Sequence, residues 1–89
     1  MDEWIRLADG TLLENTYIVD LGNDLIAVYS RSVQTAREAW SLFGDPDRTQ
    51  IIHSDQYQEK RTWMDYTEPQ SIQSMPGGGM CVTLGKGAV

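Results

Sequence analysis

The sequence is poor in the residues that build covalent staples and metal sites, with one cysteine, Cys81, and one histidine, His53, in 89 residues. A single cysteine forms no internal disulfide, and the repeated Cys and His spacing of a structural zinc site is missing. No apolar run approaches the roughly 18 residues that a membrane-spanning helix needs. We therefore expect a protein of a reducing compartment, the cytosol, with no metal, no cofactor and no membrane segment.

Positive charge is also scarce, because seven Lys and Arg residues face 13 Asp and Glu residues, giving a net charge of −6. An acidic surface repels phosphate, which argues against general nucleic-acid binding and against anionic membranes. Acidity suits docking onto a basic protein groove, including one that normally holds nucleic acid. The simpler alternative is that the charge keeps a small protein soluble.

The chain length predicts one domain, residues 1–89, with a small hydrophobic core. A deep catalytic pocket is hard to build at this size without a disulfide, a metal or a partner subunit. Residues 85–89, which include Gly85 and Gly87, are expected to form a loose tail.

One segment, from Ser32 to Gly44, has the pattern of an amphipathic helix. Its apolar residues recur at the three- and four-residue spacing of one helical face. They are Val33, Ala36, Ala39, Trp40 and Phe43. Ser32 is a suitable N-cap, and Gly44 can end the helix in the left-handed conformation before Pro46 stops it. A lone helix of this kind must bury its apolar stripe against a sheet.

Short apolar or alternating runs on either side of this helix predict strands. The predicted strands are residues 4–7, 12–21, 25–29, 50–53, 57–66, 71–75 and 80–84. Turn residues at Asp9-Gly10, at 22–24 and at 76–79 separate consecutive runs. The prediction is an α+β fold, an antiparallel sheet of about six or seven short strands with one helix, about residues 33–43, packed across it.

His53, Ser54 and Asp55 are the residue types of a hydrolase triad, but they are consecutive. Neighbouring side chains on an extended chain point to opposite sides, so these three cannot converge as nucleophile, base and orienting acid. Asp45 and Asp47 have the alternate spacing of some calcium loops, yet the glycine and glutamate of that motif do not follow. We predict no catalytic and no metal-binding residues.

Two further features have structural interpretations. The glycines at 77–79 could cradle a phosphate, but they lead into a predicted strand rather than a helix, which favours a hairpin turn. Cys81 lies in an apolar strand, which favours a buried, unreactive thiol.

One polar stretch is rich in the residue types that dominate binding hot spots. Its candidate binding residues are Tyr57, Arg61, Trp63 and Tyr66. We take them as a hypothetical recognition or self-association surface. In a domain this small, Trp63 is also expected to be at least partly buried.

Several short phrases occur together in an order that resembles a group of small accessory proteins encoded in prophages of Gram-positive gut bacteria. The phrases are Leu7-Ala8-Asp9-Gly10-Thr11, Glu14-Asn15, Phe43-Gly44-Asp45-Pro46 with Thr49, and Cys81-Val82-Thr83-Leu84-Gly85-Lys86-Gly87. The resemblance covers residues 7–87, and it rests on order and spacing. It implies phage origin and an accessory, non-catalytic role, and it supplies no catalytic residues.

Three functions are compatible with these observations. The first is a phage protein that binds and neutralises a host factor in the host cytoplasm, as an anti-defence inhibitor or by sequestering a small signalling ligand. The second is an accessory subunit of the phage particle, in the tail or baseplate, where strand edges would suit homo-oligomer formation. The third and weakest is a minimal enzyme.

Overall fold

The computed structural model describes residues 3–45, 50–54 and 61–87, with the side chains of 53–54 and 61–62 excepted. The described part contains eight strands and one helix. They are β1 Trp4–Leu7, β2 Leu12–Glu14, β3 Thr16–Gly22, β4 Leu25–Ser30, α1 Ala36–Phe43, β5 Ile51–Ser54, β6 Arg61–Trp63, β7 Tyr66–Ser74 and β8 Met80–Lys86.

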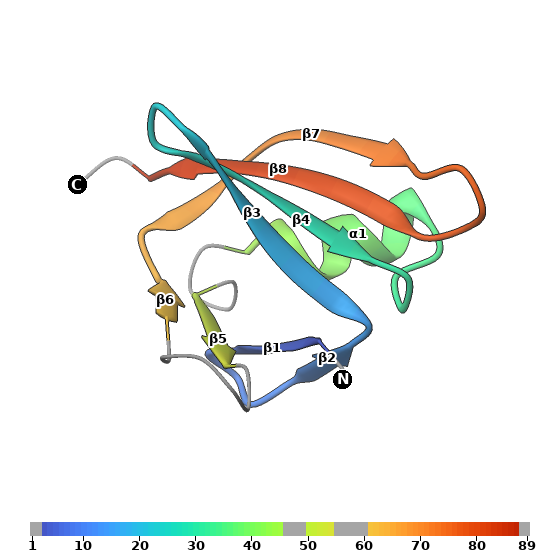
Figure 1. Ribbon diagram of the computed structural model, residues 1–89, viewed down its shortest axis with the longest axis horizontal. Helices are drawn as coiled ribbons and strands as arrows, with labels where there is room; N and C mark the ends of the chain where they lie inside the picture. The colour runs from blue at the N-terminus through green and yellow to red at the C-terminus, as the bar shows by residue number, and fades with distance from the viewer. Residues whose placement is uncertain (1–2, 46–49, 55–60, 88–89) are drawn as a thin grey trace.

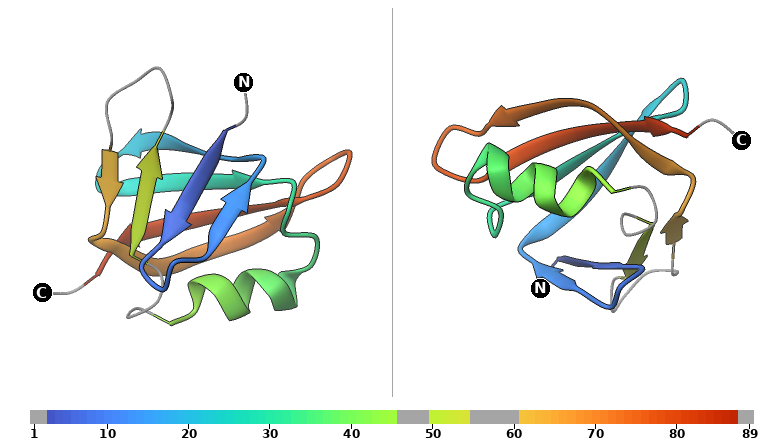
Figure 2. Two further views of the ribbon diagram at one scale, coloured as in Figure 1. Left: turned by 90° about the horizontal axis from the view of Figure 1, so that it is seen from below. Right: turned by 180° about the vertical axis from the view of Figure 1, so that it is seen from behind.

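The strands form two antiparallel sheets, in the orders β2-β1-β5-β6 (the first sheet) and β3-β4-β8-β7 (the second sheet). The sheets lie face to face and their strands cross (Figure 1; Figure 2, left). The predicted antiparallel α+β class with one helix is confirmed. The prediction of a single sheet is wrong, because the chain changes sheets three times, between β2 and β3, between β4 and β5 through α1, and between β6 and β7.

The first change of sheet occurs at Asn15, inside the segment 12–21 that the sequence predicts as one strand. Asn15 has a φ of 53°, a left-handed conformation that asparagine tolerates better than most residues. The conformation ends β2 and turns the chain into β3. The predicted strand 12–21 is therefore two strands, β2 and β3, joined by a corner at Asn15.

A chain of hydrogen bonds holds this corner against the end of β4. The Ser32 N–H donates to Ser30 Oγ (3.2 Å), Ser30 and Thr16 share a buried hydroxyl pair (2.7 Å), and Thr16 Oγ1 donates to the Glu14 carbonyl (2.9 Å). Ser30 and Thr16 are almost fully buried. Because each hydroxyl both donates and accepts, neither is left unsatisfied in the interior.

One hydrophobic cluster fills the space between the two sheets and the helix. Buried residues alternate along β1 and along most of β8, and Phe43 is the largest fully buried side chain. The cluster consists of Ile5, Leu7, Leu13, Ile26, Val28, Val33, Ala39, Phe43, Ile51, Met80, Val82 and Leu84.

The helix α1 packs against β7 and β8 and is shorter than predicted (Figure 2, right). It begins after Thr35, whose hydroxyl accepts the Glu38 N–H at 3.1 Å, so Thr35 rather than Ser32 is the N-cap. The Ser32 hydroxyl instead donates to the Glu14 carbonyl. Gly44 ends the helix in the right-handed region, at φ −84°, and not in the predicted left-handed conformation.

The buried face of α1 is also narrower than predicted. Ala39 and Phe43 are fully buried, but Ala36 is exposed and Trp40 is 55% exposed. Ala39 and Phe43 are one helical turn apart, whereas Trp40 is rotated by about 100° from Ala39. Of the eight residues of α1, only Ala39 and Phe43 are fully buried, so the helix contributes one narrow stripe to the core.

The predicted strand 57–66 is divided in the structure. Residues 57–60 lie outside the described residues, β6 ends at Trp63, and β7 starts at Tyr66 in the other sheet. Glu68 and Pro69, which separate the predicted strands 57–66 and 71–75, fall inside β7. Pro69 is accommodated because β7 is the last strand of its sheet and its register shifts on either side of this residue.

The C-terminal segment is more ordered than the predicted loose tail. β8 continues through Gly85, which is buried, to Lys86, and the Gly87 N–H donates to the Asp65 carbonyl at 2.8 Å. Residues 88–89 lie outside the described residues.

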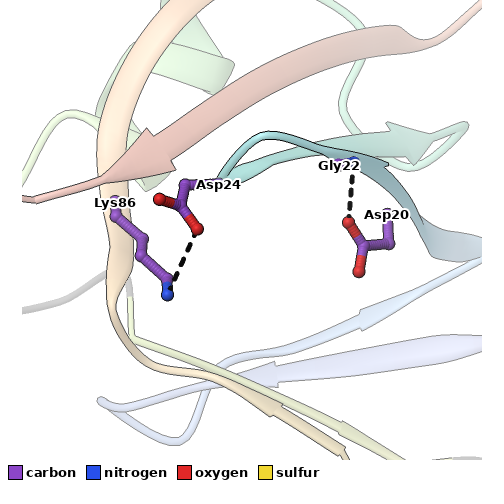
Figure 3. A network of polar contacts seen from close by, with 4 residues as sticks. All are labelled: Asp20, Gly22, Asp24 and Lys86. Atoms are coloured by element: carbon purple, nitrogen blue, oxygen red, sulfur yellow. Dashed lines mark hydrogen bonds and ion pairs between the residues drawn. The ribbon is translucent and has the colours of Figure 1, made fainter.

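The predicted turn at 22–24 is confirmed. Asn23 and Asp24 both have positive φ, 54° and 60°, as a two-residue hairpin turn of the I′ type requires. Figure 3 shows that Asp24 forms an ion pair with Lys86 (3.3 Å) and that Asp20 accepts the Gly22 N–H (2.9 Å). The hydrogen bond and the charge of Asp24 raise the pKa of Lys86.

Candidate functional site

The structure brings together two of the four residues predicted as a binding surface. Trp63 and Tyr66 lie on either side of the β6–β7 turn, with ring centroids 5.5 Å apart in an edge-to-face arrangement. Arg61 lies in β6, with its side chain outside the described residues, and Tyr57 lies outside them altogether.

Trp63 faces the interior of the molecule. It lies directly opposite Ile51, which is fully buried, and side chains of directly opposite residues share one face of a sheet. Trp63 and Tyr66 are half-buried and pack against the core cluster, as expected for Trp63. This pair therefore contributes packing at the corner between the two sheets.

Most of the residues considered for catalysis or metal binding lie outside the residues that the structure describes. The side chains of His53 and Ser54 are not described, and neither are Asp47 and Asp55. Among the described residues, His, Cys, Asp and Glu side chains form no group of three that could hold a metal.

A different site lies on the outer face of the second sheet, the face turned away from the first sheet. It is a shallow hollow of about 220 Å³, which we call the tyrosine hollow. Its lining residues are Glu3, Asn15, Tyr17, Tyr29, Arg31 and Met75. They come from β3, β4, the start of the described chain and the β7–β8 hairpin.

Two stacked tyrosines form the floor of this hollow. Tyr17 on β3 lies directly opposite Tyr29 on β4, and their rings are 5.1 Å apart and within 15° of parallel. Tyr17 is 41% exposed and Tyr29 is half-buried. The stack offers an aromatic surface that is already arranged for contact with a second planar or apolar group.

Hydrogen bonds to backbone carbonyls hold the rim of the hollow. The Arg31 N–H donates to the Asn15 carbonyl (3.0 Å), the Thr16 N–H donates to the Glu3 carbonyl (3.1 Å), and the Gln34 side-chain amide donates to the Arg31 carbonyl. Arg31 and Glu3 place one positive and one negative side chain beside the tyrosines. The hollow can therefore bind an apolar or planar group on the tyrosines and orient it through its polar atoms at Arg31 and Glu3.

Cys81 lies behind the tyrosine stack, directly opposite Tyr29 on the side away from Tyr17. Burial raises the pKa of the Cys81 thiol, although a hydrogen bond with Tyr29 lowers it in part. The charge of Cys81, followed by burial, raises the pKa of Tyr29. Both groups are therefore held in their neutral forms at neutral pH.

This coupling predicts a slow thiol and a loss of stability in alkali. Because both folded-state pKa values are raised, their stabilising contribution is complete at neutral pH and is lost as pH rises above about 9. At pH 8 we expect Cys81 in the folded protein to react with a disulfide reagent several-fold more slowly than in urea-unfolded protein. Tyr29→Phe should slow the reaction further, since it removes the hydrogen bond that lowers the thiol pKa; equal folded and unfolded rates would contradict the expectation.

Sequence reasoning missed the tyrosine hollow because the pairing of Tyr17 with Tyr29 depends on a bulge. A regular strand pair around the turn at Asn23-Asp24 would place Tyr29 opposite Ile18. The register shifts by one residue between Asp20 and Gly22, and this shift brings the two tyrosines onto the same face. The residue types alone could have raised the possibility, but the pattern did not reveal their contact.

Comparison with family models, curated proteins and solved structures finds no match to this chain. The described residues contain no helix with the length and apolar character required to cross a membrane. The functional argument therefore depends on the geometry and chemistry of the site.

Proposed function

We propose that this protein is a non-catalytic binding protein that neutralises a host factor, with the tyrosine hollow at the centre of its contact surface. The observation that supports this proposal is the Tyr17–Tyr29 stack beside Arg31, open to solvent on the outer face of the second sheet. Tyrosine and arginine are the residue types whose truncation most often abolishes protein–protein binding.

The size of the hollow favours a protein as the target. Pockets that enclose small molecules usually measure about 300–1,000 Å³, whereas this hollow measures about 220 Å³ and is open. It suits one protruding side chain or loop of a partner, with Tyr17 contacting an apolar group and Arg31 contacting a carboxylate or carbonyl. A small signalling ligand would stack on Tyr17 and place its anionic group at Arg31.

Charge favours a basic partner. The protein has a net charge of −6, and Glu3 adds a carboxylate to the rim of the hollow. Association with a basic surface would be accelerated by this field and weakened by salt. The resemblance to small prophage proteins suggests that the target is a component of host antiviral defence in the host cytoplasm.

A phage-particle subunit of the tail or baseplate is the second candidate function. The observation that favours it is strand β3, which is seven residues long and lies at the edge of the second sheet. Edge strands of this length can assemble subunits by strand addition. A minimal enzyme remains the weakest candidate.

The proposal predicts that target binding depends on the tyrosine hollow. Tyr17→Ala and Arg31→Glu should each weaken capture of the target by at least about 30-fold, as expected for central contact residues. Leu12→Ala is the matched control, because Leu12 is a similarly exposed apolar residue (44%) on the first sheet. The measurement is affinity capture from a Gram-positive host lysate with mass spectrometry of proteins and small molecules, followed by calorimetry with the purified target.

Two outcomes would overturn the proposal. One is a captured target whose affinity is the same for the wild-type protein, Tyr17→Ala and Arg31→Glu. The other is detection of the protein as a stoichiometric component of purified phage particles, which would support the particle-subunit candidate. Circular dichroism of each variant confirms that the fold is retained.

A further inference from the structure

We infer that β3 is a pairing edge for a second copy of this chain, and that two copies join through Ile18 and Asp20 into one continuous sheet. In the order β3-β4-β8-β7, β3 pairs with β4 on one side. No other strand of the described chain pairs with its opposite edge. Figure 2 (left) shows β3 at the side of the second sheet remote from α1.

The hydrogen-bond phase of β3 identifies which backbone groups point to that edge. The Arg31 N–H donates to the Asn15 carbonyl, in the same register that pairs Tyr17 with Tyr29. Along an antiparallel strand, the residues that bond to the neighbour alternate with residues whose N–H and C=O point away from it. Ile18 and Asp20 are therefore the residues whose backbone groups face the edge.

The accessible stretch of the edge is short. The Thr16 N–H already donates to the Glu3 carbonyl at 3.1 Å, so the start of the described chain covers the edge at that point. At the other end, the bulge between Asp20 and Gly22 interrupts the strand. A pairing partner can therefore use Ile18 and Asp20 together with the side chains around them.

One antiparallel register satisfies these limits with a second copy. A two-fold axis at Val19 places Ile18 of each copy opposite Asp20 of the other, so both pairs can exchange N–H···O=C bonds. An axis at Ile18 would require the Thr16 N–H, which is already used. An axis at Asp20 would place the two Asp20 carboxylates directly opposite each other. The edge is self-complementary in the first register, which is why we assign a second copy rather than an unrelated extended peptide.

The side chains beside this edge supply apolar surface for the contact. Tyr17 is 41% exposed, Val19 is 40% exposed, and Leu21, at the bulge, is 49% exposed. Pairing two such strands would bury roughly 800–1,000 Å² in total, which is near the lower limit of a specific interface. The dimer is therefore weak and depends on protein concentration.

The dimer would also change the tyrosine hollow, and this consequence rests on the proposed function. In the assigned register, Leu21 of the partner subunit lies across from Tyr17, which lines the hollow. The hollow thus gains an apolar wall from the second copy. Pairing itself does not depend on what the hollow binds.

The salt dependence of the affinity distinguishes this self-association from docking to a basic target. Two copies with a net charge of −6 repel each other, so added salt should strengthen the dimer. Asp20→Asn should strengthen it as well, because the amide oxygen can still accept the Gly22 N–H while the charge is removed. Binding to a basic target should respond to salt in the opposite direction.

Disulfide trapping tests the assigned register. Val19→Cys in a Cys81→Ser background places two thiols on the two-fold axis at a non-hydrogen-bonded pair, where Cα atoms are about 4.5 Å apart and a disulfide can form. With oxidised glutathione at about 100 μM protein, most of the folded protein should become a covalent dimer. Leu12→Cys in the same background is the control, since Leu12 is similarly exposed (44%, against 40% for Val19) on an edge strand of the other sheet. Cross-linking of Val19→Cys no greater than that of Leu12→Cys would overturn the inference.

Sedimentation equilibrium of the purified protein provides a second test. Val19→Lys places two ammonium groups together at the axis and should raise the dimer dissociation constant at least tenfold, whereas Leu12→Lys should not change it. A wild-type protein that stays monomeric at millimolar concentration would overturn the inference. Because no target is present, either result leaves the proposed function to be judged by the Tyr17→Ala capture experiment.

Discussion

Phe43→Ala is expected to lower the free energy of unfolding by about 3–5 kcal/mol, the range observed for truncation of a large buried aromatic side chain. Phe43 is fully buried in the single core cluster, between the helix and the two sheets. Domains of this size are stabilised by only about 5–10 kcal/mol in total, so the loss is a large fraction. Urea denaturation followed by circular dichroism measures the change.

Trp40→Ala is the matched control on the same helix. The sequence pattern places Trp40 and Phe43 on one face, but Trp40 is 55% exposed. Its replacement should change the free energy of unfolding by less than about 1 kcal/mol, since surface substitutions have small effects and alanine favours the helix. Equal losses for Phe43→Ala and Trp40→Ala would contradict the observed orientation of α1.

Gly79→Ala is expected to destabilise the protein by about 3 kcal/mol. Gly79 has a φ of +91°, and a Cβ at this position would lie 2.5 Å from the Ser30 carbonyl oxygen and 2.9 Å from Arg31 Cα. These are backbone atoms of the neighbouring strand end, so they cannot move aside as a side chain does. The cost combines a strained φ of about 1–2 kcal/mol with a steric term of similar size.

Gly77→Ala separates the two contributions. Gly77 also has a positive φ, +85°, but a Cβ there would meet no atom within 4 Å. Its substitution should therefore cost only the conformational term, about 1–2 kcal/mol.

Gly79→Ala should in addition weaken target binding, because Arg31 and Met75 line the tyrosine hollow and both are contacted by the added methyl group. Thermal unfolding of both variants that gave equal midpoints would contradict the steric argument.

The elements that local sequence predicts well are those whose signals lie within a few residues. The turn at Asn23-Asp24, the apolar strand β4 and the existence of α1 follow from turn chemistry and from periodicity. The predicted N-cap was wrong because Ser32 and Thr35 are both suitable by type, with serine slightly preferred. A contact 18 residues away, from Ser32 to the Glu14 carbonyl, decides between them.

The division into two sheets was not predictable from the same signals. An apolar alternating run from 12 to 21 is the pattern of one strand, yet Asn15 turns the chain between sheets within it. The corner persists because Thr16 and Ser30 satisfy each other in the interior. Only the folded chain brings these two hydroxyls, 14 residues apart, into contact.

The candidate site could not be predicted from local sequence either. Tyr57, Arg61, Trp63 and Tyr66 attracted attention by residue type and proximity in sequence, but Trp63 faces the core. Tyr17 and Tyr29 are 12 residues apart, and a one-residue bulge makes them neighbours. Side-chain period in a strand is two residues, so a shift of one residue decides which side chains meet.

By itself, the sequence determined an acidic, cysteine-poor α+β domain with one helix and tight hairpin turns, because charge, composition and short-range periodicity are properties of the chain. Tertiary structure alone decided that the strands form two sheets, that Trp40 faces solvent, and that two tyrosines stack on an outer face beside a strand edge. These features depend on register and on contacts between distant residues, whose energies no local pattern contains.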